Sequence, residues 1–276
     1  MTAVLLALGA SLAWGVADFV GPLKGRTLGT LRVLLWAQVG GLLAIGAVVA
    51  IRAQAPQEAA ILLAVPAAIS GILGLYAYYR GVATGTMSVV APIAGASAIV
   101  PVLFGFAAGD RPSTPQLAGI AAAIVGVVLA SREQQAGERR IAAGVGLALL
   151  AAVGFGFYFP PMHAAGAADF WWASLVFRAT AAAVVAGIVV ARRPSLRLRP
   201  VDLLIVAAIG IGDTIGNVLF AASSDSGLVS LTSVLASLYP IVTVLLAATV
   251  LHETVGGGQR VGIVLTLAGV VLIAAG

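Results

Sequence analysis

The second half of this sequence repeats the pattern of the first. Prolines, acids, glutamines and glycines follow one another in the same order in residues 91–129 and 230–272. The corresponding residues are Pro101 and Pro240, Asp110 and Glu253, Gln116 and Gln259, Gly119 and Gly262, and Gly126 and Gly269. Nearer the start of each half, Trp14-Gly15 corresponds to Phe155-Gly156. Two similar halves of about 138 residues indicate a duplicated architecture.

Both halves are too apolar to fold in water. Hydrophobic residues make up 61% of the chain and charged residues only 9%, against about 25% in soluble domains. A surface with so few charges must face lipid. The 34 glycines agree with this environment, because small residues let helices approach closely within a bilayer.

The composition also argues against several kinds of site. The chain has no cysteine, so it has no disulfide, no thiolate-bound metal and no cysteine nucleophile. Its two histidines, His163 and His252, fall in separate loops, and the sequence contains no nucleotide-binding loop, catalytic triad or zinc spacing. We therefore predict no cofactor, no metal site and no enzymatic activity. The net charge of +5 does not indicate nucleic acid, because the arginines lie in short loops between apolar runs.

The apolar runs predict the fold class: an all-α integral membrane protein with ten transmembrane helices arranged as two inverted five-helix repeats. About 20 apolar residues cross a bilayer. The predicted spans are 3–21, 31–51, 59–80, 87–108, 114–131, 141–160, 171–191, 201–223, 228–251 and 257–275. The first lacks a preceding basic segment and is predicted to be retained. Residues 1–131 form the first repeat, 132–140 a linker and 141–276 the second, and an odd number of spans gives the repeats opposite orientations.

Asp213 is the foremost candidate for a functional residue. It lies near the middle of the eighth predicted span, and Asn217 follows one helical turn later on the same face. A carboxylate inside the membrane costs about 2.5–3.5 kcal/mol on insertion scales, so it indicates a functional site. Asp213 could bind a coupling proton, a cation or the ammonium group of a substrate. The structural alternative is an ion pair with Arg178, at a comparable depth in the seventh span.

Aromatic residues accompany acids in two other spans. Asp18 follows Trp14 by one turn in the first span, so a ring and a carboxylate can face one cavity, although Asp18 could also be solvated at the interface. Tyr76, Tyr78 and Tyr79 end the third span. Tyrosines are common at membrane interfaces, but Tyr76 and Tyr79 share a face, and Tyr76 is a candidate to line the cavity.

The ninth predicted span contains a stripe of hydroxyl groups. Ser230, Ser233 and Ser237 follow at i, i+3 and i+7, so they either bond across packed helices or line a wet path. Pro240 in this span and Pro101 in the fourth remove a backbone hydrogen bond and are expected to bend their helices. Paired bends at corresponding places suit a gate, although helices also bend merely to pack.

Two acids correspond in the repeats at loop-to-helix boundaries. Asp110 precedes the fifth predicted span, and Glu253 precedes the tenth. A carboxylate at a helix start can accept hydrogen bonds from unpaired backbone N–H groups. We interpret both as capping residues.

The order of these motifs resembles the EamA branch of the drug/metabolite transporter superfamily. The ten spans in two repeats, the proline–acid–glutamine–glycine–glycine order and Trp14-Gly15 carry the resemblance, which covers essentially the whole chain. Arg32 and Arg178 resemble the arginine near the start of that family's second and seventh helices. The chain departs from the family in having Asp110 where glutamate is usual and Phe155 where tryptophan is expected.

The resemblance and the loop charges imply opposite orientations. The family resemblance implies that both termini lie in the cytoplasm. The loops on one side hold 12 basic residues, and those on the other hold only Arg52 and Arg111. The 12 are Lys24, Arg26, Arg32, Arg80, Arg132, Arg139, Arg140, Arg192, Arg193, Arg197, Arg199 and Arg260. By themselves, these charges place the 12-residue side in the cytoplasm and both termini outside.

The resemblance implies a metabolite transporter, typically an exporter, with a central cavity between the halves. We predict a multi-pass protein of the cell membrane, monomeric or homodimeric, that carries a small metabolite such as an amino acid or a cationic amphiphile. Without an ATP-binding element its energy must come from a gradient, with the proton as a possible coupling ion. A non-transporting membrane partner or assembly protein, and an intramembrane lipid-modifying enzyme, remain alternatives.

Overall fold

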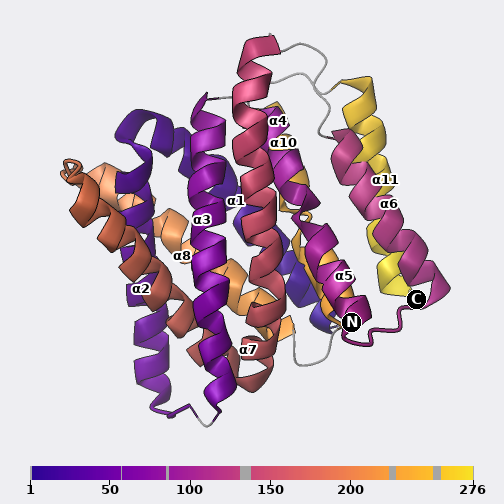
Figure 1. Cartoon of the computed structure of the whole chain (residues 1–276), viewed down its shortest axis with the longest axis horizontal. Helices are drawn as coiled ribbons and strands as arrows, with labels where there is room; N and C mark the ends of the chain where they lie inside the picture. Colours follow the sequence, from indigo (N-terminus) through magenta and orange to yellow (C-terminus); the bar gives the residue numbers. More distant parts are fainter. Residues whose placement is uncertain are drawn as a thin grey trace.

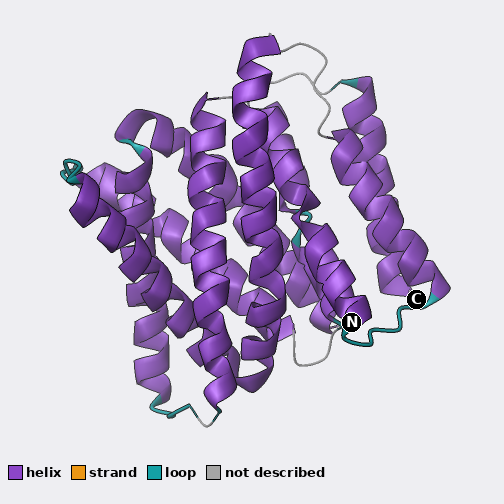
Figure 2. Ribbon diagram, viewed as in Figure 1, coloured by secondary structure: helices purple, strands orange, loops and turns teal. Residues whose placement is uncertain are grey.

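A computed structural model describes residues 2–56, 58–84, 87–130, 138–223, 228–250 and 256–275, and these residues fold into helices joined by short loops (Figures 1 and 2). The α-helices are α1 (Thr2–Leu28), α2 (Thr30–Arg52), α3 (Ala64–Thr84), α4 (Met87–Gly95), α5 (Ile99–Ala107), α6 (Thr114–Ala130), α7 (Glu138–Arg192), α8 (Pro200–Ser223), α9 (Val229–Ala236), α10 (Tyr239–Val250) and α11 (Gly257–Ala275). Two 3-10 helices, η1 (Ala59–Leu63) and η2 (Ala96–Ala98), precede α3 and α5.

The 55-residue α7 consists of two helices that meet at Asp169. A straight helix of that length would measure about 80 Å, more than twice the apolar thickness of a bilayer. At Asp169 the backbone is extended (φ −163°, ψ 106°). The Asp169 Oδ1 then accepts the N–H groups of Trp171 (2.9 Å) and Trp172 (3.1 Å) and so caps the second arm. The two arms contain the sixth and seventh predicted spans.

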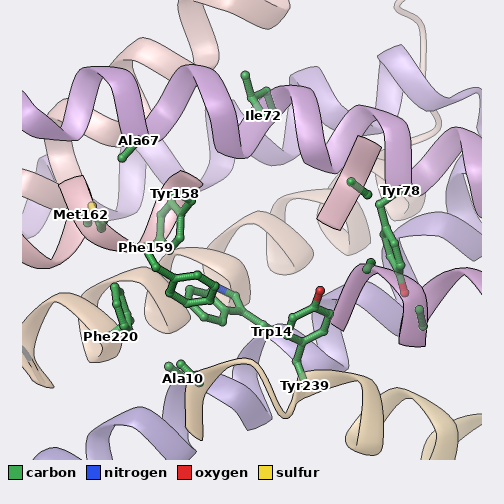
Figure 3. Close-up of a cluster of buried hydrophobic side chains, with 14 of the residues drawn as sticks. Ala10, Trp14, Ala67, Ile72, Tyr78, Tyr158, Phe159, Met162, Phe220 and Tyr239 are labelled. Carbon is green, nitrogen blue, oxygen red and sulfur yellow. The ribbon is translucent and has the colours of Figure 1, made fainter. Parts of the chain in front are cut away.

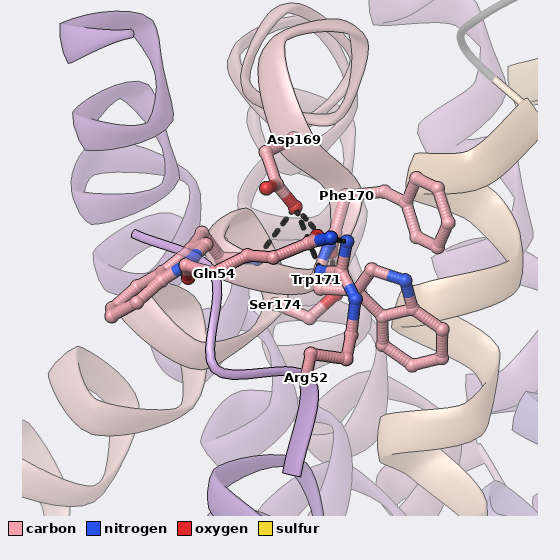
Figure 4. A network of polar contacts seen from close by, with 7 residues as sticks. Arg52, Gln54, Asp169, Phe170, Trp171 and Ser174 are labelled. Carbon is pink, nitrogen blue, oxygen red and sulfur yellow. Dashed lines mark hydrogen bonds and ion pairs between the residues drawn. The ribbon is translucent and has the colours of Figure 1, made fainter. Parts of the chain in front are cut away.

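The break in α7 is fastened to the end of α2 (Figure 4). Arg52 Nη1 lies 3.8 Å from Asp169 Oδ1, and its guanidinium lies 5.5 Å from the centre of the Trp171 ring. On the other side, Trp172 Nε1 donates to the Gln54 carbonyl at 2.8 Å. These contacts fix the point from which the second arm of α7 returns along α2.

Among the described residues, six helical stretches are long and apolar enough to cross a membrane. They are Thr2–Leu28, Thr30–Arg52, Ala59–Thr84, Gly144–Arg192, Pro200–Ser223 and Val229–Val250. The fourth contains both arms of α7, while Ile93–Ala107 and Thr114–Gly126 are apolar but shorter. Every predicted span contains helix, and both termini lie at the same end of the molecule (Figure 1). The protein is thus an all-helical, multi-pass membrane protein, and the count of ten spans stays a prediction.

The two halves interleave. Helix α1 packs against α8 and α10, α2 against α8 and α7, α3 against α7, and α6 against α11. Glycines allow these approaches: a Cβ on Gly40 of α2 would lie 2.8 Å from the Ala207 Cα, and one on Gly210 of α8 would collide with the Ala37 carbonyl. The core therefore lies between helices of different repeats.

The repeated glycines and acids serve the same cross-repeat packing. A Cβ on Gly269 of α11 would lie 2.6 Å from the Gly119 carbonyl oxygen of α6, so two repeated glycines meet. Asp110 Oδ2 accepts the N–H of Ser230 at 2.9 Å and caps α9, a helix of the other repeat. The start of α6 is capped instead by a reciprocal pair between Ser113 and Gln116. Glu253, the corresponding acid, lies outside the described residues.

Both prolines predicted to bend helices follow an interruption. The 3-10 turn η2 separates α4 from α5, and Pro101 is the third residue of α5. Likewise α9 ends at Ala236, and Pro240 is the second residue of α10. Proline is tolerated in a first helical turn because the N–H it lacks has no partner there. The fourth and ninth predicted spans are therefore broken at corresponding places, and a role in gating stays a prediction.

We expect Gly210→Ala to destabilise the protein and Gly212→Ala, two residues away on α8, not to do so. The first methyl group collides with the α2 backbone and should cost roughly 1–3 kcal/mol, while the second has no atom within 4 Å. Thermal unfolding in detergent measures the difference. Equal stability of the two variants would contradict the close contact of α2 and α8.

Replacing Asp110 by alanine should cost about 1 kcal/mol of stability, because the start of α9 loses its cap. Asp110→Asn keeps an acceptor oxygen and should retain most of it. Glu58→Ala is the control, since Glu58 is exposed and makes no side-chain cap. If all three variants unfold like the wild type, the cross-repeat cap contributes nothing to stability.

Candidate functional site

A cavity lies at the centre of the interleaved helices and is lined by both halves. Its residues come from α1, α2, α3, α7, α8 and α10: Trp14, Asp18, Gln38, Gly71, Ile72, Leu75, Phe155, Tyr158, Phe159, Phe177, Ala181, Asp213, Asn217 and Tyr239. It has a volume of about 60 Å³. That space holds a few water molecules but no metabolite, since each water occupies about 30 Å³ in the liquid.

Aromatic rings form one wall of the cavity (Figure 3). The Trp14 ring meets Tyr158 nearly edge to face, with centroids 5.8 Å apart at 79°, and Phe159 at 6.1 Å. Phe177 adds a contact to Tyr158 at 5.4 Å. Such edge-to-face arrangements are favoured by the ring quadrupoles and make the wall rigid.

The Trp14-Gly15 pair fits between α8 and α10 because glycines lie at both contacts. The Trp14 Nε1 donates to the Asp213 backbone carbonyl of α8 at 3.3 Å, and a Cβ on Gly216 would overlap the indole ring. A Cβ on Gly15 would lie 2.9 Å from the Tyr239 carbonyl oxygen of α10. The motif therefore brings α1 against α8 and α10 and directs the indole to the cavity.

A buried arginine on the second arm of α7 contacts both α8 and α2. Arg178 is 0% exposed. Its Nη2 pairs with Asp213 Oδ2, and its Nη1 donates to Gln38 Oε1 at 2.7 Å. Gly41 leaves room for the side chain, since a Cβ there would lie 3.2 Å from Arg178 Nε. The charge of Asp213 is thus compensated within the protein.

Asp18, unlike Asp213, has no ion pair with the described residues. It is only 6% exposed and lines the same cavity, yet no cation of the described residues pairs with its carboxylate. Its backbone carbonyl accepts a hydrogen bond from Tyr78 Oη at 3.4 Å. Pro22, four residues later in α1, has no N–H to donate to that carbonyl. Helix α1 therefore lacks one backbone hydrogen bond at Asp18.

Two lining residues carry hydrogen-bond donors that the described protein leaves unpaired. Tyr158 Oη donates to Asn217 Oδ1 at 3.2 Å, and the Asn217 Nδ2 has no acceptor. The Tyr239 Oη, which lies close to the Ser97 hydroxyl, makes no hydrogen bond of normal geometry in the described protein either. Buried donors are usually paired, so these groups indicate a water or ligand partner in the cavity.

The structure brings four of the predicted cavity residues together and leaves the others aside. Trp14, Asp18, Asp213 and Asn217 all line the cavity. Tyr76 is partly buried and packs against the hydrophobic core, and it is not among the residues that line this cavity. Its role as a cavity residue stays a prediction.

The predicted stripe of serines also lies elsewhere. Ser230, Ser233 and Ser237 are buried but do not line the cavity. Helix α9 ends before Ser237, whose hydroxyl donates to the Ser233 carbonyl at 2.6 Å. Ser230 faces α5, where a Cβ on Gly105 would lie 3.0 Å from the Ser230 Cβ. The Ser230 and Ser233 Oγ atoms have no hydrogen-bond partner among the described residues, so bonding across packed helices and a wet path both stay open as interpretations of the stripe.

Sequence reasoning missed several lining residues. Gln38 is the most informative, because a lone amide inside an apolar span is itself a signal of a buried polar site. Tyr158 and Phe159 follow Phe155, which the repeat had already aligned with Trp14. A one-turn extension of that correspondence would have found them.

Comparison with known proteins agrees with this architecture. The model of the EamA-like transporter family matches residues 1–132 and 142–275. A solved structure titled "Crystal structure of protein" has the same fold, with a TM-score of 0.75 and 21% identity over 98% of this chain and 95% of that one. Among curated proteins, none matches this chain.

The Arg178–Asp213 pair should be strongly coupled in stability. Asp213→Asn leaves the fully buried Arg178 without its anion and should cost about 3–5 kcal/mol, while Arg178→Gln should cost less, because the Asp213 side chain is 19% exposed. The double variant should recover a large part of the loss. Folded yield and thermal unfolding in detergent complete this double-mutant cycle.

Arg199→Gln is the matched control, because Arg199 pairs with Asp202 but is 84% exposed. An exposed pair contributes about 0–1 kcal/mol, so this variant should unfold nearly as the wild type does. Additive losses in the Arg178–Asp213 cycle would contradict a buried pair.

Proposed function

We propose that this protein, which belongs to the EamA-like transporter family, is a secondary transporter that exports a small amine-bearing solute. An amino acid or a cationic amphiphile fits best. The observation that carries the proposal is a cavity shared by both halves that holds an acid without a cation, Asp18, beside an aromatic wall. Family members are transporters, and export is the direction typical of them.

The chemistry of the lining supports an amine over a sugar or an anion. An ammonium group can pair with Asp18 and lie over the face of Trp14, a cation–π contact of about 0.5–2 kcal/mol. The unpaired donors of Asn217 and Tyr239 can bind an acceptor of the same solute, such as a carboxylate or an ether. A multiply negative solute would meet two acids, and the nearby cation of the described residues, Arg178, is already paired.

The mechanism we propose is alternating access about this cavity. At about 60 Å³ the cavity is too small for the solute, so the helices around it must separate on one side to load it and on the other to release it. The interruptions before Pro101 and Pro240 lie in corresponding helices of the two repeats and are the proposed hinges. A concentration or proton gradient supplies the energy, because the sequence has no ATP-binding element.

Transport by purified protein in liposomes tests this function. The solutes are radiolabelled amino acids and cationic amphiphiles, with sugars and sugar phosphates for comparison, and we expect only the amines to move. Transport of sugar phosphates alone would overturn the proposed substrate class, and no movement of any solute would overturn the function.

Tyr239→Phe gives a sharper test of the cavity. The variant removes a hydroxyl that lies close to Ser97 but makes no hydrogen bond of normal geometry, so folding should persist, while the lost hydrogen bond to the solute weakens its binding about five- to tenfold. Tyr76→Phe is the control, since Tyr76 does not line the cavity. Equal solute affinities of the two variants would place the binding site elsewhere.

A further inference from the structure

Two carboxylates line one cavity, but only one of them has a cation. Asp213 on α8 is paired with Arg178, which is itself held by Gln38. Asp18 on α1 has no ion pair with any described residue, although it is nearly as buried as the arginine. The two acids therefore differ in what they can bind.

The groups around Asp18 supply no second cation. Tyr78 and Tyr79 face it from α3, Tyr239 from α10 and Asp213 from α8. Three of these are phenols and the fourth is an acid. Arg178, the nearby cation on α7, is occupied by Asp213. An isolated carboxylate in a low-dielectric interior is very costly, so Asp18 requires a proton or a bound cationic group.

Helix α1 lacks a backbone hydrogen bond at Asp18. Pro22 deprives the Asp18 carbonyl of its helical N–H, and the Tyr78 hydroxyl replaces it. At Gly21, a Cβ would overlap the Tyr79 hydroxyl, so this tyrosine reaches the same turn only because the residue is glycine. A helix with a missing hydrogen bond bends there more easily than elsewhere. Asp18 therefore lies in a turn of α1 that lacks one helical hydrogen bond.

We propose that Asp18 carries the coupling proton and that this proton and the cationic group of the substrate compete for it, while Asp213 stays paired with Arg178. The inference rests on the proposed transport function and deepens it. When the cation enters, the O–H bond of the Asp18 carboxyl breaks, its proton passes to water, and the carboxylate pairs with the cation. The net charge of the cavity is the same in both states, and one proton is exchanged for each cation. Asp18 thereby takes the role that the sequence favoured for Asp213.

The repeat indicates one such acid per chain. The spacing that aligns Trp14 with Phe155 aligns Asp18 with Phe159, which lines the same cavity as an apolar residue. We therefore expect each chain to exchange one proton in each transport cycle.

Infrared spectroscopy of the substrate-free full-length protein in detergent tests the proton directly. Near neutral pH, where exposed acids are ionised, we expect the carbonyl band of one protonated carboxyl. It should be lost in Asp18→Asn. Asp202→Asn is the control, because Asp202 is paired with Lys24 and Arg199. Should Asp18→Asn not fold, Asp18→Glu should shift the band. No band in the wild type, or a band that persists in Asp18→Asn or is unshifted in Asp18→Glu, overturns the proposal.

A transport measurement separates this proposal from the proposed function. Benzyltrimethylammonium has a permanent charge, so it cannot follow a pH difference by losing a proton. With one-for-one exchange, a pH difference of one unit supports an accumulation of about tenfold in wild-type liposomes and none in Asp18→Asn. Accumulation that persists in Asp18→Asn overturns the proposal alone. The expected infrared pattern without transport of any solute contradicts the proposed function alone.

Discussion

The candidate site depends on the buried pair of Arg178 and Asp213. A guanidinium that is fully enclosed by apolar helices must have its partners in place, and these come from two other helices: Asp213 from α8 and Gln38 from α2. The pair therefore holds three helices of both repeats around one point beside the cavity. Among the described residues no second cation pairs with an acid of the cavity, so in the proposed function Asp18 determines what else binds.

Close backbone approach makes that arrangement possible. A long side chain such as Arg178 fits between helices only because Gly41 leaves space for it, and α2 reaches α8 only because Gly210 has no side chain. Lipid provides little hydrophobic drive for helices to associate, so this packing and the buried polar contacts supply the attraction. Around the cavity Gly216 has the same role for Trp14. The polar site therefore depends on the glycines that let the helices approach closely.

The sequence predicted the helices and the meeting of Trp14, Asp18, Asp213 and Asn217, because lipid leaves polar groups no other place to go. The sequence says less about Tyr76, because these helices are apolar on nearly every side and the pattern does not show which face turns inward. The rotation of α3 is set by its packing against α7, a contact between repeats. The same limit hid the true partner of Asp110, whose carboxylate caps a helix 120 residues later in the chain.

Residues shared by the two repeats shape the helices, whereas residues that differ between them give the cavity its polar groups. Residues 141 positions apart line one cavity from the two halves but differ in kind. The pairs are Trp14 and Phe155, Asp18 and Phe159, and Ile72 and Asp213. An acid in one half is thus matched by an apolar residue in the other, while the glycines and prolines that shape the helices occur in both. Two similar halves can exchange open and closed conformations with little difference in packing energy. In the proposed transport cycle Asp18 is the partner of the bound cation in both conformations, so this one carboxylate is loaded from one side of the membrane and unloaded to the other.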